Sequence, residues 1–215
     1  AKVINMSFGK GYSWDKEAVD KAVKYAQDND VLLVHAAGNS NENNDDSDNF
    51  PNDRKENRGW FSSKNFKNWI EVGALNWQGG EELVAPFSNY GKDQVDLFSP
   101  GVDITSTIPN NKYASFDGTS MASPVVAGVA ALIRSYYPTL TAEQVKSILL
   151  KSVNKKNQKV KRPGDGTLVS LSDISVTGGT INAFEALKLA ANTKGKRKTA
   201  IKSYDSMTNK SLKKV

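Results

Sequence analysis

The sequence predicts an α/β fold in which a mainly parallel sheet carries helices on both faces. Three consecutive segments support this prediction: an apolar strand at 2–8, an amphipathic helix at 14–27 and a second strand at 31–37. The second strand, VLLVHAA, is almost continuously apolar, which is typical of a parallel strand buried on both faces. A strand, a helix and a strand over this length indicate a right-handed βαβ unit.

The helix at 14–27 is predicted from its apolar stripe, which recurs every three or four residues. Ser13 precedes the stripe and is the expected N-cap. Asp15 suits the first turn because a negative charge there complements the helix dipole.

The rest of the chain continues the alternation. Further strands are predicted at 69–75, 95–98, 102–106 and 113–116, and further helices at 120–137, at 142–153 and up to residue 191. Pro138 ends the first of these helices. Capping boxes open the other two, Thr141 with Gln144 and Asn182 with Glu185. Strands that alternate with helices favour a parallel sheet.

The composition is that of a globular protein, with 38% hydrophobic and 24% charged residues. No apolar run is long enough to span a membrane, no signal peptide is visible, and the absence of cysteine excludes disulfides and Cys-ligated zinc. The formal net charge is +6, but residues 193–215 hold eight Lys and Arg against one acid, so the rest is near neutral. A basic tail is usually a solvated linker, and a nucleic-acid partner is not expected. The chain thus divides into a domain at 1–192 and a basic tail or linker at 193–215.

The most specific local pattern is GTSMASP at 118–124, which places Ser120 directly before an apolar helical run. A serine at the start of a helix lies among free backbone N–H groups, which can stabilise an oxyanion. Gly118 permits backbone conformations that other residues adopt only at a cost. Taken alone, a serine in this place is more often an N-cap than a nucleophile, so the chemistry depends on the whole string.

GTSMASP, followed by VVAG at 125–128, resembles the serine motif of the subtilisin-like serine peptidases, the subtilases. Other segments agree with that family in chain order: SFG at 7–9, AAGN at 36–39, FSNYG at 87–91, VDLFSPG at 95–101 and GGTINA at 178–183. The resemblance covers about residues 1–191. It implies that the α/β fold is the subtilisin-like one, present here as a partial domain.

The resemblance also assigns roles to residues. It implies a serine endopeptidase in which the Ser120 hydroxyl attacks a peptide carbonyl and forms an acyl-enzyme, while the Ser120 N–H and the Asn39 amide bind the oxyanion. The alternative for Asn39 is a turn residue after a strand. Two segments would bind the polypeptide substrate. One is Ser7, Phe8 and Gly9, and the other is Ala36, Ala37 and Gly38. Their small, apolar walls suit an apolar or aromatic side chain. The family resemblance further implies a secreted or cell-envelope enzyme.

The chain departs from the family in its triad, which runs Asp, His and then Ser along subtilase sequences. Neither an Asp-Ser/Thr-Gly nor a His-Gly-Thr-His motif is present. The single histidine, His35, lies inside the buried strand, where we expect a core or pocket-wall role rather than that of a base. Asp117 adjoins the serine motif, but no spacing supports it as the triad acid. We therefore expect the triad Asp and His upstream of Ala1, and the chain to be the C-terminal portion of the catalytic domain.

A partial domain of this kind has two expected properties. Without its Asp and His the isolated chain should be inactive, since loss of the triad costs about 10⁶-fold in turnover in subtilisin itself. Where the missing strands belong it should expose an apolar sheet edge, which would make it marginally stable or self-associating.

Other functions fit the sequence less well. An α/β-hydrolase would need a histidine after its serine, and none follows His35. A Ser–Lys hydrolase would need a lysine placed by a motif, and none is. A non-catalytic, subtilase-like module that binds peptide is the main alternative, although such a module would not need to keep both Ser120 and Asn39.

The polar stretch after Asn39 contains clustered amide and carboxylate side chains: Asn43, Asn44, Asp45, Asp46, Asp48 and Asn49. Hard oxygen ligands of this kind can hold calcium. The sequence therefore allows a structural calcium ion, with Asp45, Asp46 and Asp48 as candidate ligands. The spacing and the glycine of an EF-hand are missing, and a solvated loop is the alternative. The chemistry itself requires no cofactor.

Overall fold

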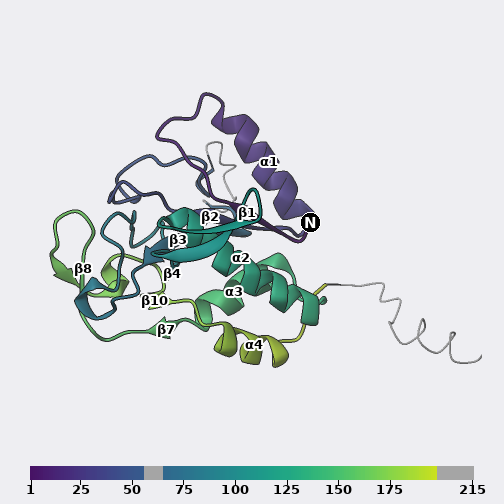
Figure 1. Cartoon of the computed structure of the whole chain (residues 1–215). Coiled ribbons are helices and arrows are strands. Elements are labelled where there is room, and N and C mark those ends of the chain that lie inside the picture. Colours follow the sequence, from purple (N-terminus) through teal and green to yellow (C-terminus); the bar gives the residue numbers. More distant parts are fainter. Residues whose placement is uncertain (56–64, 198–215) are drawn as a thin grey trace, which may run out of the picture.

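The computed structural model of the chain describes residues 1–55 and 65–197. Its centre is a six-stranded sheet (Figure 1) with the order β1 (Val3–Met6), β2 (Leu32–Ala36), β3 (Trp69–Leu75), β4 (Leu97–Pro100), β10 (Gly179–Thr180) and β7 (Asn154–Lys155). The first five of these strands pair in parallel, and only β7 is antiparallel to its neighbour. The predicted α/β fold with a mainly parallel sheet is thus confirmed.

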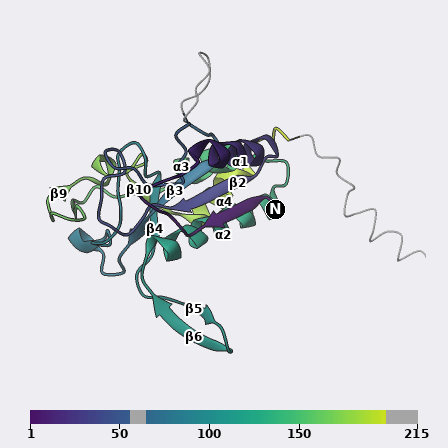
Figure 2. The same ribbon diagram turned by 90° about the horizontal axis from the view of Figure 1, so that it is seen from above.

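Helices cover both faces of the sheet (Figures 1 and 2). One face carries α1 (Lys16–Asp28), and the other carries α2 (Thr119–Tyr136), α3 (Ala142–Lys151) and α4 (Ala183–Ala191). The side chains of β2 show why both faces must be covered. Leu32 and Val34 pack with α2 and α3, whereas Leu33 packs on the α1 side against Trp69. Because successive side chains of a strand point to opposite faces, a sheet covered twice needs a continuous apolar run.

Two small antiparallel pairs lie outside this sheet. The strands β5 (Ile104–Ile108) and β6 (Lys112–Phe116) form a hairpin that projects from the body just before α2 (Figure 2). The strands β8 (Val160–Lys161) and β9 (Leu168–Val169) form the second pair. Short 3₁₀ turns at Gly80–Glu82 (η1) and Leu171–Asp173 (η2) complete the elements.

The predicted cap of the first helix is wrong. Asp15, and not Ser13, is the N-cap, because its Oδ1 accepts the Ala18 N–H at 2.9 Å. The apolar stripe does not begin at Trp14, whose side chain is 87% exposed and packs edge-on against Tyr12. The Thr141–Gln144 capping box is present, and Asn182 caps α4 by accepting the Glu185 N–H. In the predicted tail, Lys194 and Lys196 hydrogen-bond to Gln144, and Arg197 hydrogen-bonds to Thr139. The tail beyond residue 197 lies outside the described residues.

The expected sheet edge is present at β1. Among the described residues, β1 pairs with β2 alone. Ile4 and Phe8 are 39% and 61% exposed, and beside them a largely apolar cavity of about 600 Å³ separates β1 from α1. An unpaired strand edge of this kind recruits partners. Self-association through it stays a prediction, which sedimentation at several concentrations would measure.

The glycine at the centre of β3 allows the sheet to pack closely, and we expect its replacement to be costly. A Cβ on Gly73 would lie 2.4 Å from a ring carbon of Phe98, which is completely buried. Gly73→Ala should therefore lower the free energy of unfolding by about 1–3 kcal/mol through overpacking. In α2, a Cβ on Gly128 meets nothing within 4 Å. Gly128→Ala should raise the same quantity by about 0.5–1 kcal/mol, because alanine favours helix. Urea titration measures both, and equal stability of the two variants would contradict the packing argument.

Candidate active site

Three chain segments meet at the N-terminus of α2. Ser120 occupies the first turn of this helix, Ser7 follows β1, and Asn39 follows β2. Since β1 and β2 are parallel, their carboxyl ends lie at the same edge of the sheet, which is where ligands of such folds bind. The Ser120 Oγ lies 3.5 Å from the Ser7 carbonyl oxygen. The structure therefore brings together three of the residues that the sequence predicted for the site.

The turn into α2 requires glycine. Gly118 is the N-cap, and its φ is +149°. Residues other than glycine rarely adopt a backbone conformation in this region. A Cβ there would also lie 3.3 Å from the Asn39 Nδ2. The Gly118 carbonyl accepts the N–H groups of Met121 and Ala122. Gly118 thus sets both the path of the chain into the helix and the space beside the Asn39 amide.

Thr119 fixes the orientation of the Asn39 side chain. Its backbone N–H and its hydroxyl each donate to the Asn39 Oδ1, both at 2.9 Å. The same hydroxyl accepts the Gly38 N–H at 3.1 Å. Because Oδ1 is held by two donors, the other branch of the amide, Nδ2, is the donor left for a ligand. Within the described part of the chain, no acceptor is bonded to Nδ2.

The Ser7 side chain connects β1 to the same helix end. Pro124 has no N–H to donate to the carbonyl of Ser120 four residues earlier, so that carbonyl needs another donor. The Ser7 hydroxyl supplies it at 2.8 Å, and it also lies 3.0 Å from the hydroxyl of the fully buried Ser123. A proline that would interrupt the helix thus creates the point at which β1 is attached to it.

The predicted peptide-binding residues differ in what they can present to a ligand. Phe8 is 61% exposed. Gly9 packs closely, because a Cβ there would lie only 3.2 Å from Asn49 Oδ1. The side chains of Ala36 and Ala37 are buried in the core. The segment 36–38 can therefore offer a peptide its backbone and the Cα of Gly38.

His35 is a core residue, as predicted. It is fully buried in β2. Its Nδ1 lies 2.9 Å from Glu71 Oε1 in β3, and its Nε2 lies 2.7 Å from the Phe8 carbonyl oxygen. Burial alone would lower the pKa of His35, but the charge and hydrogen bond of Glu71, together with the Phe8 carbonyl, raise it above its ordinary value. Since both ring nitrogens are occupied, His35 is not placed to take a proton from Ser120.

The acidic candidates are engaged elsewhere. Asp117 Oδ1 accepts the Asp103 N–H at 2.7 Å and so closes the base of the β5–β6 hairpin. The carboxylate of Asp45 accepts the backbone N–H groups of residues 93 and 94. Asp46 accepts an N–H of the Asn43 amide, and Asp48 is exposed. Across residues 1–55 and 65–197, no three His, Asp or Glu residues are grouped as they would be around a metal ion. In the described residues Asp45, Asp46 and Asp48 do not form such a group, and a structural calcium ion there stays a prediction.

Two residues of the site were not identified from sequence. Thr119 lies inside the serine motif, but nothing in the motif says that its hydroxyl orients an amide 80 residues away. Glu71 could have been identified from the sequence, because it is the only charged residue in the buried strand WIEVGAL. A buried carboxylate needs a partner, and the single buried histidine is its register partner in the neighbouring strand.

Comparison with known proteins agrees with this geometry. Residues 1–167 match the family model described as the subtilase family, peptidase S8. The chain belongs to the subtilase family. It is 42% identical over 149 residues to subtilisin DY of Bacillus licheniformis, an alignment that covers 68% of the chain and 47% of that relative. It is 36% identical over 172 residues to an intracellular serine protease of Paenibacillus polymyxa, covering 78% of the chain and 48% of the relative.

Solved subtilase structures show the same fold. The prenylagaramide maturation protease PagA superposes with a TM-score of 0.67 at 27% identity, over 90% of the chain and 63% of that protein. The chain spans about half the length of the two curated relatives, subtilisin DY and the intracellular serine protease. Family membership alone does not fix the compartment predicted from the resemblance, because one relative is named intracellular. No helix of the described residues is long and apolar enough to cross a membrane.

The attachment of β1 to α2 gives a prediction for stability. Ser7→Ala should lower the free energy of unfolding by about 1–3 kcal/mol, because it leaves the Ser120 carbonyl and the buried Ser123 hydroxyl without their partner. Ser115→Ala is the matched control, since this hairpin serine is exposed and bonds only to Thr105 in a neighbouring strand. The control should change stability by less than about 0.5 kcal/mol. Similar urea midpoints for both variants would count against the proposed attachment.

Proposed function

We propose that the protein carrying this chain is a serine endopeptidase that cleaves polypeptides through an acyl-enzyme on Ser120. The observation that carries the proposal is the position of Ser120 on the first turn of α2, beside an Asn39 amide whose oxygen is held by Thr119. A nucleophilic hydroxyl and preorganised donors at one helix end are what acyl transfer requires.

The donors for the oxyanion come from this helix end. The backbone N–H groups of Thr119, Met121 and Ala122 have acceptors within the protein, whereas among the described residues that of Ser120 has none. In the proposed reaction, the Ser120 hydroxyl gives its proton to the general base, which later passes it to the leaving amine, and Oγ forms a bond to the scissile carbonyl carbon as the C=O π bond opens. The resulting oxyanion accepts the Ser120 N–H and an N–H of the Asn39 amide. Collapse breaks the C–N bond, the amine leaves with a proton, and water then hydrolyses the ester.

In this proposal the general base of Ser120 is a histidine outside residues 1–215. His35 is the single histidine of the chain, and both of its ring nitrogens are hydrogen-bonded. Subtilases place their Asp and His before the Ser along the chain. We infer that the triad Asp and His precede Ala1 in the longer protein, and that the chain by itself is inactive.

A fluorophosphonate probe, which labels activated serines, tests the function directly. The longer protein should be labelled at Ser120, and neither its Ser120→Ala variant nor the chain 1–215 alone should be. Absence of labelling in the folded longer protein, together with binding of unstructured peptide, would instead support the non-catalytic peptide-binding module. Labelling of the chain alone would refute the inferred upstream base.

The hydroxyl of Thr119 gives a second prediction. Thr119→Val removes one of two donors to Asn39 Oδ1 and leaves the backbone donor in place. The value of kcat should fall about tenfold, less than the 10²–10³-fold loss seen when subtilisin itself loses its oxyanion-hole asparagine. Thr105→Val, on the exposed face of the hairpin, is the isosteric control and should leave kcat unchanged. Peptide-hydrolysis kinetics of the longer protein decide the matter, and an unaltered kcat for Thr119→Val would refute the orienting role.

A further inference from the structure

A buried histidine–carboxylate pair lies directly behind the peptide-binding segment. His35 and Glu71 are register partners in β2 and β3, and both are buried. Glu71 is held in turn by Trp69, whose indole N–H donates to Oε2 at 2.7 Å. Burying two ionisable groups is costly unless every polar atom finds a partner. The pair therefore calls for an explanation beyond core packing.

The contacts of His35 place one proton on Nε2 and suit a second on Nδ1. The Phe8 carbonyl can only accept, so the His35 Nε2 must carry a proton. Glu71 already accepts from Trp69, and as a carboxylate it also accepts from His35 Nδ1. The network is complete with an imidazolium between two acceptors. The charged state of the ring is thereby coupled to a backbone carbonyl of the segment at 7–9.

Neighbouring carbonyls of that segment point in opposite directions. The Ser7 carbonyl faces the Ser120 hydroxyl at 3.5 Å, whereas the Phe8 carbonyl faces inward to His35 at 2.7 Å. The segment is also attached at its two ends, by the Ser7 hydroxyl to α2 and by mutual backbone hydrogen bonds between Lys10 and Phe50. His35 is thus the only side chain of the described residues that hydrogen-bonds the middle of the segment from behind.

We propose that His35, held by Glu71, is a positioning residue that sets the peptide-binding segment Ser7–Gly9 in register with Ser120. This inference rests on the proposed peptidase function, because it assigns His35 to the binding of the same peptide. His35 touches no reacting atom. Its loss should therefore weaken peptide binding and leave the chemical step largely intact.

The pair should also make peptide binding depend on pH. Burial lowers the pKa of His35, but the charge and hydrogen bond of Glu71 raise it above its ordinary value, so the ring keeps its proton to a higher pH than an ordinary histidine does. A raised pKa in the folded protein means that the contribution of the pair is complete below the ordinary value of 6.5 and is lost as the pH rises through the raised pKa. Above it, Nδ1 presents a lone pair to the Glu71 carboxylate, and the network opens.

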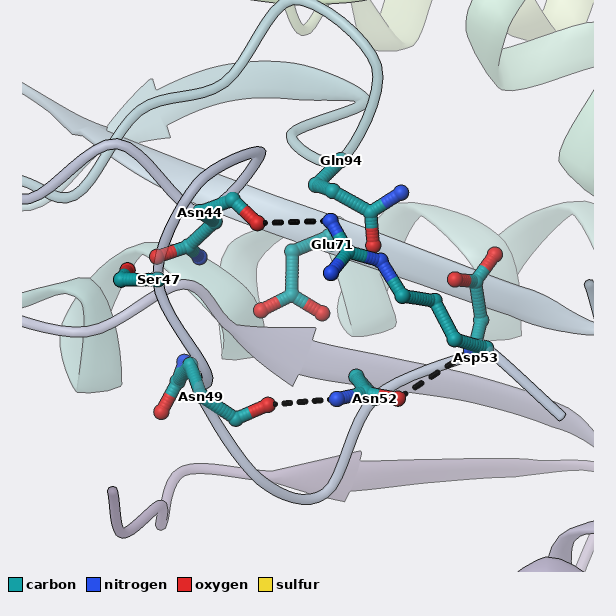
Figure 3. A pocket seen from close by; sticks show the side chains of 8 residues that line it. Asn44, Ser47, Asn49, Asn52, Asp53, Glu71 and Gln94 are labelled. Carbon is teal, nitrogen blue, oxygen red and sulfur yellow. Dashed lines mark hydrogen bonds between the residues drawn. The ribbon is translucent and has the colours of Figure 1, made fainter. Parts of the chain in front are cut away.

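Other charges surround the pair and must be separated from it. Glu71 and Asp53 border a small polar cavity (Figure 3). Arg54 lines the same cavity. Asp96 accepts the Glu71 backbone N–H and pairs with Lys146 of α3. Burial raises the pKa of Asp53 to about 6, and burial raises that of Asp96 as well. These carboxyl groups lose their charge as the pH falls, whereas the pair loses its proton as the pH rises.

The α1 side adds one more charged pair near the segment. Lys16 and Asp20 line the apolar cavity beside Phe8 and are bonded to each other at 2.7 Å. The groups to be considered around the histidine–carboxylate pair are therefore those of α1, the loop at 53–54, the segment before β4, and α3. Among them, His35 is the group that hydrogen-bonds the Phe8 carbonyl, and its pKa is raised above its ordinary value.

Two substitutions of Glu71 separate positioning from folding. The amide introduced by Glu71→Gln can donate to Nδ1 of a neutral ring and still accept from Trp69, so Nε2–H keeps its bond to Phe8 without any titration. The leucine of Glu71→Leu offers neither a donor to Nδ1 nor an acceptor for the Trp69 N–H. In the longer protein, the wild-type KM for a peptide should rise about tenfold as the pH rises from 7 to 10. Glu71→Leu should show the raised KM throughout, and Glu71→Gln should restore binding with a flat profile, all with kcat changed less than about twofold.

A matched control and a second measurement keep the test decisive. Glu143→Gln makes the same chemical change on an exposed position of α3 and should keep the wild-type profile. Nitrogen-15 NMR of histidine-labelled protein reads the ring directly, and the His35 signals are identified as those that change in Glu71→Gln. We expect both nitrogens protonated at pH 7 in the wild type, and a neutral ring with the proton on Nε2 in Glu71→Gln.

The outcomes distinguish this inference from the proposed function. If the longer protein is not a peptidase, the NMR result still tests the state of His35, and peptide affinity replaces KM. A neutral His35 at pH 7 in the wild type would overturn the inference. A KM that rises with pH equally in wild type and Glu71→Gln would overturn it too, even in a fully active enzyme.

Discussion

The first turn of α2 is the constraint on which the site depends. Pro124 leaves the Ser120 carbonyl without a helical donor, and the Ser7 hydroxyl supplies one. Two residues before Ser120, Gly118 turns the chain so that Thr119 can hold Asn39. The geometry of the candidate active site follows from these contacts, because they join β1, β2 and α2 at one edge of the sheet.

The sheet makes this arrangement rigid by being buried on both faces. Leu32 and Val34 face the three helices of one side, and Leu33 faces α1. His35 shares the α1 face with Leu33, and it is the one ionisable group of β2. Its pairing with Glu71 satisfies both charges where water does not reach. His35 also hydrogen-bonds the Phe8 carbonyl, so the polar part of the core and the segment at 7–9 are one hydrogen-bonded unit.

The structure also explains how an incomplete constellation can be well ordered. The proposed nucleophile Ser120, the proposed oxyanion donors and the segment at 7–9 are all held by contacts within residues 7–123. None of these contacts involves a triad histidine or aspartate. The proposed upstream residues would therefore add a base to a preformed half of the site, next to the strand β1 whose outer edge is unpaired among the described residues.

The sequence by itself determined the fold class, the serine motif and the family, because hydrophobic periodicity and glycine-led motifs are local. The strand at 69–75 and the Thr141–Gln144 box were predicted with their correct bounds. Local rules failed at Ser13, because Asp15 caps the helix instead and Trp14 lies exposed before the helix start at Lys16. They were silent on Thr119 and on the pairing of His35 with Glu71. Only the tertiary structure decided those, since strand register and helix docking bring together side chains 36 and 80 residues apart.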